Sequence, residues 1–345
     1  MNLKEFTPIS ELCLEKTKIT KPKFNVFDIH SHWGRLLLGN EYEKSYNTAD
    51  TIARFKRAGL KGIVNLDGEC SDNLNRMLSK TNNSFIKTFG TLDVTMLDNP
   101  GFENYVFKNI GDMKKKGVCG LKFWKTTGLV HKDKNDNYIR PDDARLKCIW
   151  QTAAENNLPI LFHIADPTAF FKPINNFNER FEELCDHPDW AFNSQELYKF
   201  EQLMEMQENL LYNNKKTSFI IAHVGSYSEN LKQVGKWLDA YPNMYVDIAQ
   251  RISELGRQPY TARKFFIDYA DRILFGSDIT PLFSENYYEI YYRFLETYDE
   301  YFNYDFSPTG NQGRWNIYGI GLPDDVLEKI YYKNAEKLIN PEGIC

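Results

Sequence analysis

Two histidines one residue apart, His30 and His32, stand at the end of a short apolar run and could together bind one metal ion. The run over residues 24–27 follows Pro22 and favours a buried β-strand. Side chains alternate between the two faces of a strand, so residues two positions apart point the same way. Imidazole nitrogen is a good ligand for Zn²⁺, Mn²⁺ and Fe²⁺. Such a pair alone is more often incidental than functional, so its interpretation depends on the rest of the chain.

Other residues that could bind metal or do chemistry stand within or at the end of further apolar runs: Lys122, His163, His223 and Asp278. Each has an ordinary structural explanation when taken singly, such as a hydrogen-bonded core histidine or a helix-capping aspartate. The chain contains six histidines, and four of them end such runs. The remaining two, His131 and His187, lie in polar sequence and are expected at the surface. Randomly placed histidines would rarely be distributed in this way, so the set together predicts a metal centre.

Eight apolar runs must position these residues, at about 24–30, 61–66, 85–92, 117–123, 159–164, 217–223, 243–248 and 272–277. Helical periodicity lies between most of them. Thr48 and Asp142 are expected to cap two of the helices, and Pro259 suits the first turn of a third. Alternating strands and helices predict parallel strands. Eight such units predict an α/β protein with the (β/α)8 TIM-barrel fold, whose chemistry lies at the carboxyl ends of the strands. An open doubly wound sheet is disfavoured, because no GxGxxG motif follows the first strand.

Two segments are too long to be simple connections: residues 165–216 after the fifth strand and 279–322 after the eighth. Both leave the face where chemistry is expected. They either shape a substrate pocket or pack as extra helices at the barrel rim. Since no linker or repeat is visible, residues 1–345 are predicted to form a single barrel domain, with residues 1–23 as an N-terminal extension.

Composition limits the functional classes. The formal net charge is −5 and no long basic run occurs, which argues against a nucleic-acid partner. No segment has the length needed to span a membrane, and residues 1–6 lack the apolar core of a signal peptide. The six cysteines form no CxxC or zinc-knuckle spacing, so a reducing cytoplasm is the simplest location. We therefore expect a small-molecule substrate and leave open whether the chain forms a homo-oligomer.

A metal centre of this kind implies a particular chemistry. Three or four imidazole and carboxylate ligands leave one coordination position open for water or substrate. A water bound there loses a proton near neutral pH and becomes a nucleophile. A further histidine beside the metal could transfer protons or polarise a carbonyl group.

The strand-end motifs resemble those of the amidohydrolase superfamily over residues 24–340. They are Asp28-Ile29-His30-Ser31-His32, Phe162-His163, Ile221-Ala222-His223-Val224-Gly225 and Phe275-Gly276-Ser277-Asp278. Residues 333–338 also look like the closing helix of the amidohydrolase-related branch, which is similar to aminocarboxymuconate-semialdehyde decarboxylase. The resemblance implies that one divalent metal, most often zinc, with manganese or iron as alternatives, is bound by four residues: His30, His32, His163 and Asp278. It further implies that His223 is the acid/base or polarising group, and that Asp278 takes a proton from the metal-bound water.

Lys122 leaves the number of metal ions open. In two-metal members of the superfamily the fourth strand supplies a carboxylated lysine that bridges both ions, and His163 and His223 would then hold the second ion. Lys122 lies on the strand that this role requires. The decarboxylase-like branch generally uses one metal, so one metal is favoured, with Lys122 contacting the substrate or lying nearby.

Residues just beyond the strand ends are candidates for substrate binding: Trp33, Arg35, Trp124 and Arg251. A guanidinium group can hold a carboxylate with two hydrogen bonds, and an aromatic ring can stack on a planar substrate. Each of them could equally be a rim residue or a salt-bridge partner. Asp28 has the same strand parity as His30 and could orient the ligands.

The sequence thus predicts a metal-dependent hydrolase that uses metal-activated water on a C–O or C–N bond of a small organic acid, lactone or amide. His223 and Asp278 are its predicted catalytic residues. The alternative is a metal-dependent lyase, a decarboxylase or hydratase, that acts on an unsaturated carboxylic acid with the same residues. A third alternative is a barrel that binds metal or ligand without turnover.

Overall fold

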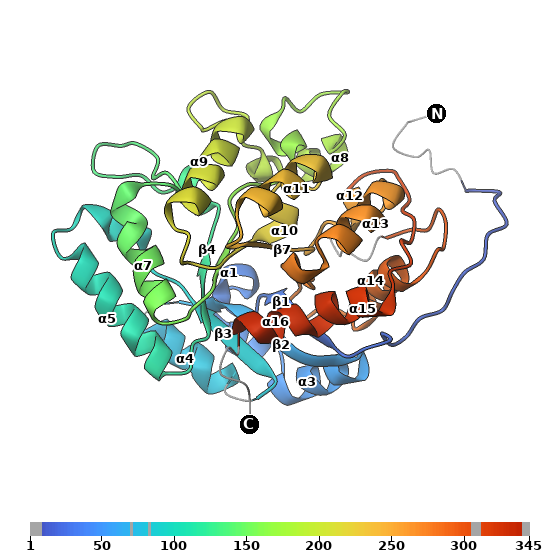
Figure 1. Ribbon diagram of the computed structural model, residues 1–345, viewed down its shortest axis with the longest axis horizontal. Coiled ribbons are helices and arrows are strands. Elements are labelled where there is room, and N and C mark those ends of the chain that lie inside the picture. The colour runs from blue at the N-terminus through green and yellow to red at the C-terminus, as the bar shows by residue number, and fades with distance from the viewer. Residues whose placement is uncertain (1–8, 70–71, 82–83, 305–311, 340–345) are drawn as a thin grey trace.

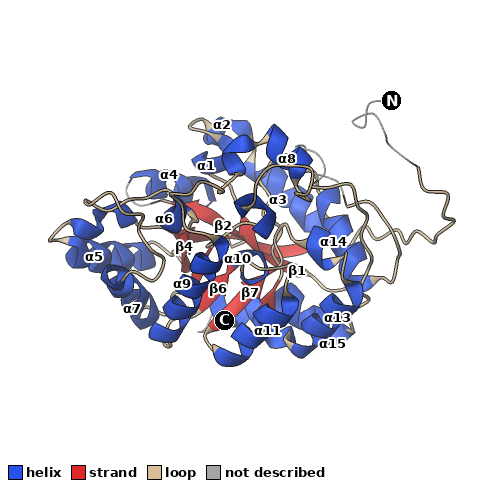
Figure 2. Cartoon of the chain, turned by 90° about the horizontal axis from the view of Figure 1, so that it is seen from above, coloured by secondary structure: helices blue, strands red, loops and turns tan. Residues whose placement is uncertain are grey.

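Eight parallel strands form the centre of the molecule. The computed structural model describes residues 9–69, 72–81, 84–304 and 312–339. Its strands pair in chain order, and the predicted barrel is confirmed. Figure 2 shows them in the middle of the molecule, with helices around them. They are β1 (Val26–Ser31), β2 (Leu60–Gly68), β3 (Ile86–Gly90), β4 (Gly120–Phe123), β5 (Ile160–Phe162), β6 (Phe219–Ile221), β7 (Met244–Asp247) and β8 (Ile273–Leu274).

The barrel closes through the chain just beyond β8. The His32 amide donates to the Ile279 carbonyl at 2.8 Å, and the Asp278 amide donates to the His30 carbonyl at 2.8 Å. Because β8 itself is only two residues long, these later residues complete the pairing with β1. Closure therefore places Asp278 directly beside the two histidines of β1.

Helices cover the outside of the strands and extend over the rim (Figure 1). They are α1 (Arg35–Leu38), α2 (Tyr42–Ser45), α3 (Thr48–Arg57), α4 (Asp72–Thr81), α5 (Phe102–Lys115), α6 (Thr126–Leu129), α7 (Lys147–Glu155), α8 (Phe181–Asp186), α9 (Phe200–Asn213), α10 (Ala222–Gly225), α11 (Leu231–Ala240), α12 (Ile252–Leu255), α13 (Pro259–Asp268), α14 (Asn286–Glu296), α15 (Asp324–Glu328) and α16 (Asn334–Ile339). A π-helical turn, Lys329–Lys333, joins α15 to α16, so the expected closing helix is present. Among the described residues, every helix is too short or too polar to cross a membrane.

The capping predictions were partly wrong. Asn47, not Thr48, caps α3, because its side chain accepts from a backbone amide in the first turn. Asp143, not Asp142, caps the 3₁₀ turn that leads into α7. Pro259 does begin α13. Where two adjacent residues can both cap, only the backbone path decides which side chain reaches the free amides.

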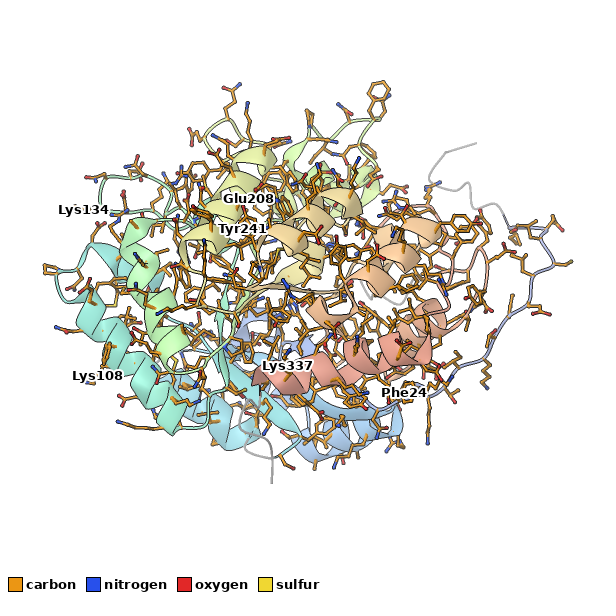
Figure 3. All side chains as sticks on the ribbon, viewed as in Figure 1. Phe24, Lys108, Lys134, Glu208, Tyr241 and Lys337 are labelled. Carbon is orange, nitrogen blue, oxygen red and sulfur yellow. The ribbon has the colours of Figure 1, made fainter. Side chains whose placement is uncertain are left out.

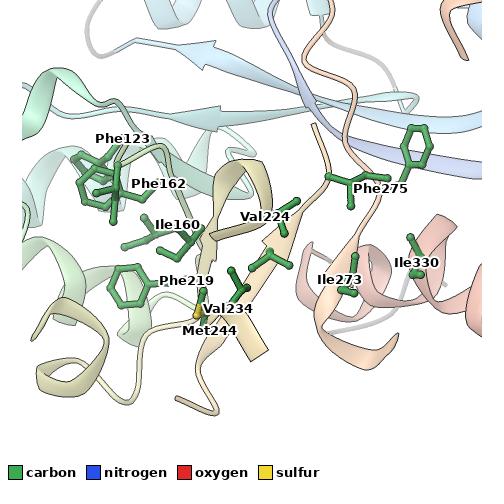
Figure 4. Close-up of a cluster of buried hydrophobic side chains, with 14 of the residues drawn as sticks. Phe123, Ile160, Phe162, Phe219, Val224, Val234, Met244, Ile273, Phe275 and Ile330 are labelled. Atoms are coloured by element: carbon green, nitrogen blue, oxygen red, sulfur yellow. The ribbon is translucent and has the colours of Figure 1, made fainter. Parts of the chain in front are cut away.

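Apolar side chains on the two faces of the strands form two clusters. The larger one lies between the strands and the helices; Figure 4 shows part of it, including Phe123, Phe162 and Phe219. The smaller one includes Leu161 and Ile220 at alternate strand positions, and we assign it to the barrel interior. Charged groups such as Lys108 and Lys134 stand on the outside, where the Tyr241 hydroxyl also donates to Glu208 at 3.2 Å (Figure 3).

The two long segments do contain extra helices. Residues 165–216 form α8 and α9 with short 3₁₀ turns, and residues 279–322 contain α14. The described part of the N-terminal extension is held to the second segment, because Thr17 donates from its amide and its hydroxyl to Asp299 at 2.8 and 2.6 Å. The expected extra helices are thus confirmed in both segments, and a role in shaping the pocket stays a prediction.

Candidate metal centre

Three of the predicted ligands meet at the carboxyl end of the barrel. The Nε2 atoms of His30 and His32 lie 3.5 and 3.2 Å from Oδ1 of Asp278. Each of the three residues offers one ligand atom within 4.8 Å of the others, and both histidines are only 1% exposed. Two imidazole nitrogens and one carboxylate oxygen are a donor set that suits Zn²⁺, Mn²⁺ and Fe²⁺. The residues present therefore fit a divalent metal.

The backbone is left-handed at two of the strand ends that carry the site. Asp278 has φ 63°, and His223 has φ 59° with ψ 48°. Residues other than glycine rarely adopt this conformation, which costs about 1–3 kcal/mol at each position. The barrel must hold these residues there by other contacts, and such outliers are concentrated at functional sites.

Hydrogen bonds set the orientation of three of the histidine rings. Nδ1 of His30 lies 2.8 Å from Asp247, and Nδ1 of His32 lies 2.7 Å from Asp67. Nδ1 of His223 lies 2.9 Å from the backbone carbonyl of Ala249. A carboxylate or carbonyl oxygen only accepts, so each Nδ1 must donate its proton. The opposite nitrogen, Nε2, then carries the lone pair that a metal or a proton needs.

His163 lies beside this cluster but not inside it. Its ring centroid is 4.4 Å from that of His223, while its Nε2 lies 3.1 Å from Oδ1 of Asp166. Among the described residues, the groups close enough to share an ion do not include His163. The structure thus brings together three of the four predicted ligands and places the fourth next to them.

Sequence reasoning assigned no role to the two carboxylates that hold the histidines of β1. Asp67 is near the end of β2, and Asp247 is the last residue of β7. Oδ1 of Asp247 also accepts from the His223 amide at 2.8 Å, so one carboxylate positions parts of two strand ends. The available signal was that both residues stand at the ends of predicted strands. Acidic residues at such positions are also common as caps of the following helix, so this signal did not single them out.

Charges inside the site are strongly coupled. Burial lowers the pKa of His32, but the carboxylates of Asp67 and Asp278 outweigh it and raise that pKa to about 9. Burial alone would raise the pKa of Asp278, yet His30 and His32 hold it well below its usual value. A proton on His32 and a divalent cation would therefore compete for the same position, so metal binding there should depend on pH.

Lys122 is fully buried within β4. Its Nζ has no hydrogen-bond partner among the described residues and lies 4.5 Å from the Trp124 ring centroid. Burial lowers its pKa to about 8, against the attraction of Asp278 and Asp247. An unpaired amine of this kind is rare in a folded protein and indicates a site where an anionic group is expected.

The four candidates for substrate binding lie in different environments. Trp33 is fully buried and packs against Tyr46 and Phe55, so it is a core residue rather than the expected substrate-binding residue. Arg35 is exposed and pairs with Glu69 at 2.6 Å.

The other two lie close to the centre. The Trp124 ring centroid is 4.9 Å from that of His32. Arg251 is 6% exposed and lies close enough to His223 for its charge to lower the histidine pKa. Trp33 and Arg35 follow the histidine pair in sequence, but the first packs in the core and the second pairs with Glu69.

Asp28 orients the backbone rather than the rings. Its Oδ1 accepts from the amides of His30 and Ser277 at 3.0 and 3.1 Å, and its Oδ2 accepts from the Tyr288 hydroxyl at 2.7 Å. It thereby links the strand ends that carry His30 and Asp278. Burial raises the pKa of Asp28 to about 7, even though these hydrogen bonds lower it.

Comparison with known families identifies the class of protein. The family model described as amidohydrolase matches residues 27–340, so the chain belongs to the amidohydrolase family and is an enzyme of that family. A search of curated proteins found no match.

Solved structures share the fold at low identity. An uncharacterized TIM-barrel protein from Bordetella bronchiseptica has 12% identity and a TM-score of 0.54, covering 91% of this chain and 98% of that one. A dihydroxybenzoic acid decarboxylase from Polaromonas sp. JS666, with bound manganese and the inhibitor 2-nitroresorcinol, has 12% identity and a TM-score of 0.53, covering 93% and 98%. A dihydroorotase from Campylobacter jejuni has 13% identity and a TM-score of 0.50, covering 96% and 88%. The likeness extends to hydrolases and decarboxylases alike.

Proposed function

We propose that this enzyme binds one divalent metal, with zinc as the first candidate, and hydrolyses a small organic acid, lactone or amide. His30, His32 and Asp278 would hold the metal, and His163 would join them through its remaining nitrogen. The observation that carries the proposal is the meeting of two Nε2 atoms and one carboxylate oxygen within 4.8 Å at the barrel mouth. A metal bound there would polarise a carbonyl group and acidify water.

His223 is the group that would move the proton. Its Nδ1 donates to the Ala249 carbonyl, so Nε2 is free to accept. Burial above all, with contributions from the neighbouring His163 and Arg251, lowers its pKa well below the usual value, so the ring is neutral at pH 7. A neutral imidazole held in one tautomer can take a proton from the attacking water and return it to the leaving group. Asp278, beside it, is the second candidate for holding that proton.

Two cations could recognise a carboxylate on the substrate. Lys122 provides a buried, unpaired amine, and Arg251 provides a guanidinium group near His223. Both support an acidic substrate over a neutral one.

The same features support the lyase as a second candidate. A carboxylate held by a buried amine and an aromatic ring, away from bulk water, is also the substrate group that a decarboxylase must remove. The Trp124 ring, close to His32, would then stack on an unsaturated or aromatic acid.

A substrate panel under metal control tests the proposal. The purified chain is stripped with a chelator, reloaded with Zn²⁺, Mn²⁺ or Fe²⁺, and assayed for opening of lactones, hydrolysis of amides, and release of CO₂ from unsaturated acids. We expect activity only after reloading, with lactones or amides as the turned-over class. Release of CO₂ without hydrolysis would assign the lyase, and undiminished activity in stripped protein would contradict the metal centre.

Replacing Lys122 tests the number of metal ions. Lys122→Met keeps the side-chain volume and removes an unpaired buried amine, so we expect a free energy of unfolding about 1–3 kcal/mol higher. Bound metal should stay at the wild-type level, while KM for acidic substrates rises. The control Lys108→Met, at an exposed position, should change none of these. Loss of half the metal would instead show that Lys122 bridges two ions.

The cysteine spacing supports a reducing cytoplasm as the location of the enzyme. We further propose that residues 1–345 act as one domain.

A further inference from the structure

We propose that Lys125 and Asp166 form a positioning pair that fixes the tautomer of His163, so that this histidine would bind the metal through Nδ1 while His30 and His32 use Nε2. The inference rests on the proposed metal centre. It assigns a role to two residues just beyond β4 and β5.

The direction of the Asp166 contact determines where the His163 proton lies. Asp166 is buried, and Nζ of Lys125 pairs with its Oδ2, so the side chain is held as a carboxylate. An ionised carboxylate can only accept, so Nε2 of His163, at 3.1 Å from Oδ1, must donate. Nδ1 of His163 is then unprotonated and has no partner among the described residues. This arrangement is the reverse of that in His30, His32 and His223, which all donate from Nδ1.

The second carboxylate oxygen is held by Lys125. Its Nζ pairs with Oδ2 of Asp166, and the ammonium also lies 5.0 Å from the Phe192 ring centroid. Each oxygen of Asp166 therefore has its own partner, which prevents the carboxylate from rotating away from the histidine. Residues beyond Asp166 are held as well, since the Thr168 amide donates to Glu229 at 2.7 Å.

Asp166→Asn is the sharpest test, because the Lys125 ammonium determines the orientation of the new side-chain amide. The amide NH₂ group would meet the ammonium unfavourably, so the amide oxygen faces Lys125 and the NH₂ group faces Nε2. Nε2 must then accept, the proton moves to Nδ1, and the ligand lone pair is lost. We expect metal affinity to fall by roughly 10- to 100-fold. Asp166→Glu should recover part of it, and the exposed control Asp186→Asn should change nothing.

Two measurements are needed. Histidine ¹⁵N spectra of the full-length chain, recorded after a chelator has removed any metal, report the tautomer of His163. The variant His163→Gln identifies which signals belong to this residue. We expect Nε2–H for His163 in the wild type and Nδ1–H in Asp166→Asn. Competition with a chromophoric chelator then gives the affinity for Zn²⁺.

A double variant separates tautomer control from simple packing. In Lys125→Met with Asp166→Asn the amide is free to turn its oxygen towards Nε2, so part of the lost affinity should return. If the two substitutions acted only on packing, their losses of metal affinity would add, and this result would overturn the proposal. A proton on Nδ1 of His163 in the wild type would overturn it as well. If the wild type fails to bind any cation, the proposed function fails, while the ¹⁵N spectra still decide the role of Asp166.

Discussion

His223→Asn is expected to lower kcat by about 10²- to 10⁴-fold while the enzyme keeps its metal. Asparagine suits this position for two physical reasons. It tolerates the left-handed backbone, φ 59°, better than most residues. Its side-chain amide can also donate to the Ala249 carbonyl in place of Nδ1. The variant therefore removes only Nε2, the atom proposed to move the proton.

The measurement is kcat on the substrate that the panel identifies, together with metal content by elemental analysis. The matched control is His187→Asn, since His187 stacks on Trp190 with ring centroids 4.0 Å apart, within the segment after β5. That variant should keep wild-type activity. If His223→Asn lost half of the metal, His223 would be a ligand of a second ion, and the one-metal proposal would be wrong.

His30→Ala is expected to reduce bound metal from the wild-type level to nearly none. The substitution deletes one ligand nitrogen from the group that also contains His32 and Asp278. It also leaves Oδ2 of Asp247 without its 2.8 Å partner in a fully buried position. Loss of that hydrogen bond should lower the free energy of unfolding by about 1–3 kcal/mol, beyond any stabilisation lost with the metal.

Elemental analysis and thermal unfolding, each with and without chelator, separate the two effects. We expect chelator to lower the melting temperature of the wild type and to leave that of His30→Ala unchanged, because the variant has no metal to lose. An equal chelator effect in both proteins would mean that metal binds elsewhere. Asp186→Asn, exposed on α8, is a suitable control for the unfolding experiment.

The barrel was predictable because its signals are local. Each strand is a short apolar run, and the spacing of the runs predicts parallel strands joined by helices. Once the barrel is assumed, residues at strand ends must converge, which is why His30, His32 and Asp278 could be grouped. Helix caps and rim positions were less predictable. Asn47 rather than Thr48 caps α3, and Trp33 is buried in the core although it directly follows the histidine pair.

The sequence by itself determined the strands, their order and the types of residue at their carboxyl ends, since these depend on neighbours within a few positions. Only the tertiary structure decided which oxygen holds each imidazole. Asp247 reaches His30 across 217 positions of the chain, and Asp67 reaches His32 across 35. These contacts choose between the two nitrogens of each ring, a choice that depends on where barrel closure places an acceptor and that leaves no pattern in the residues nearby.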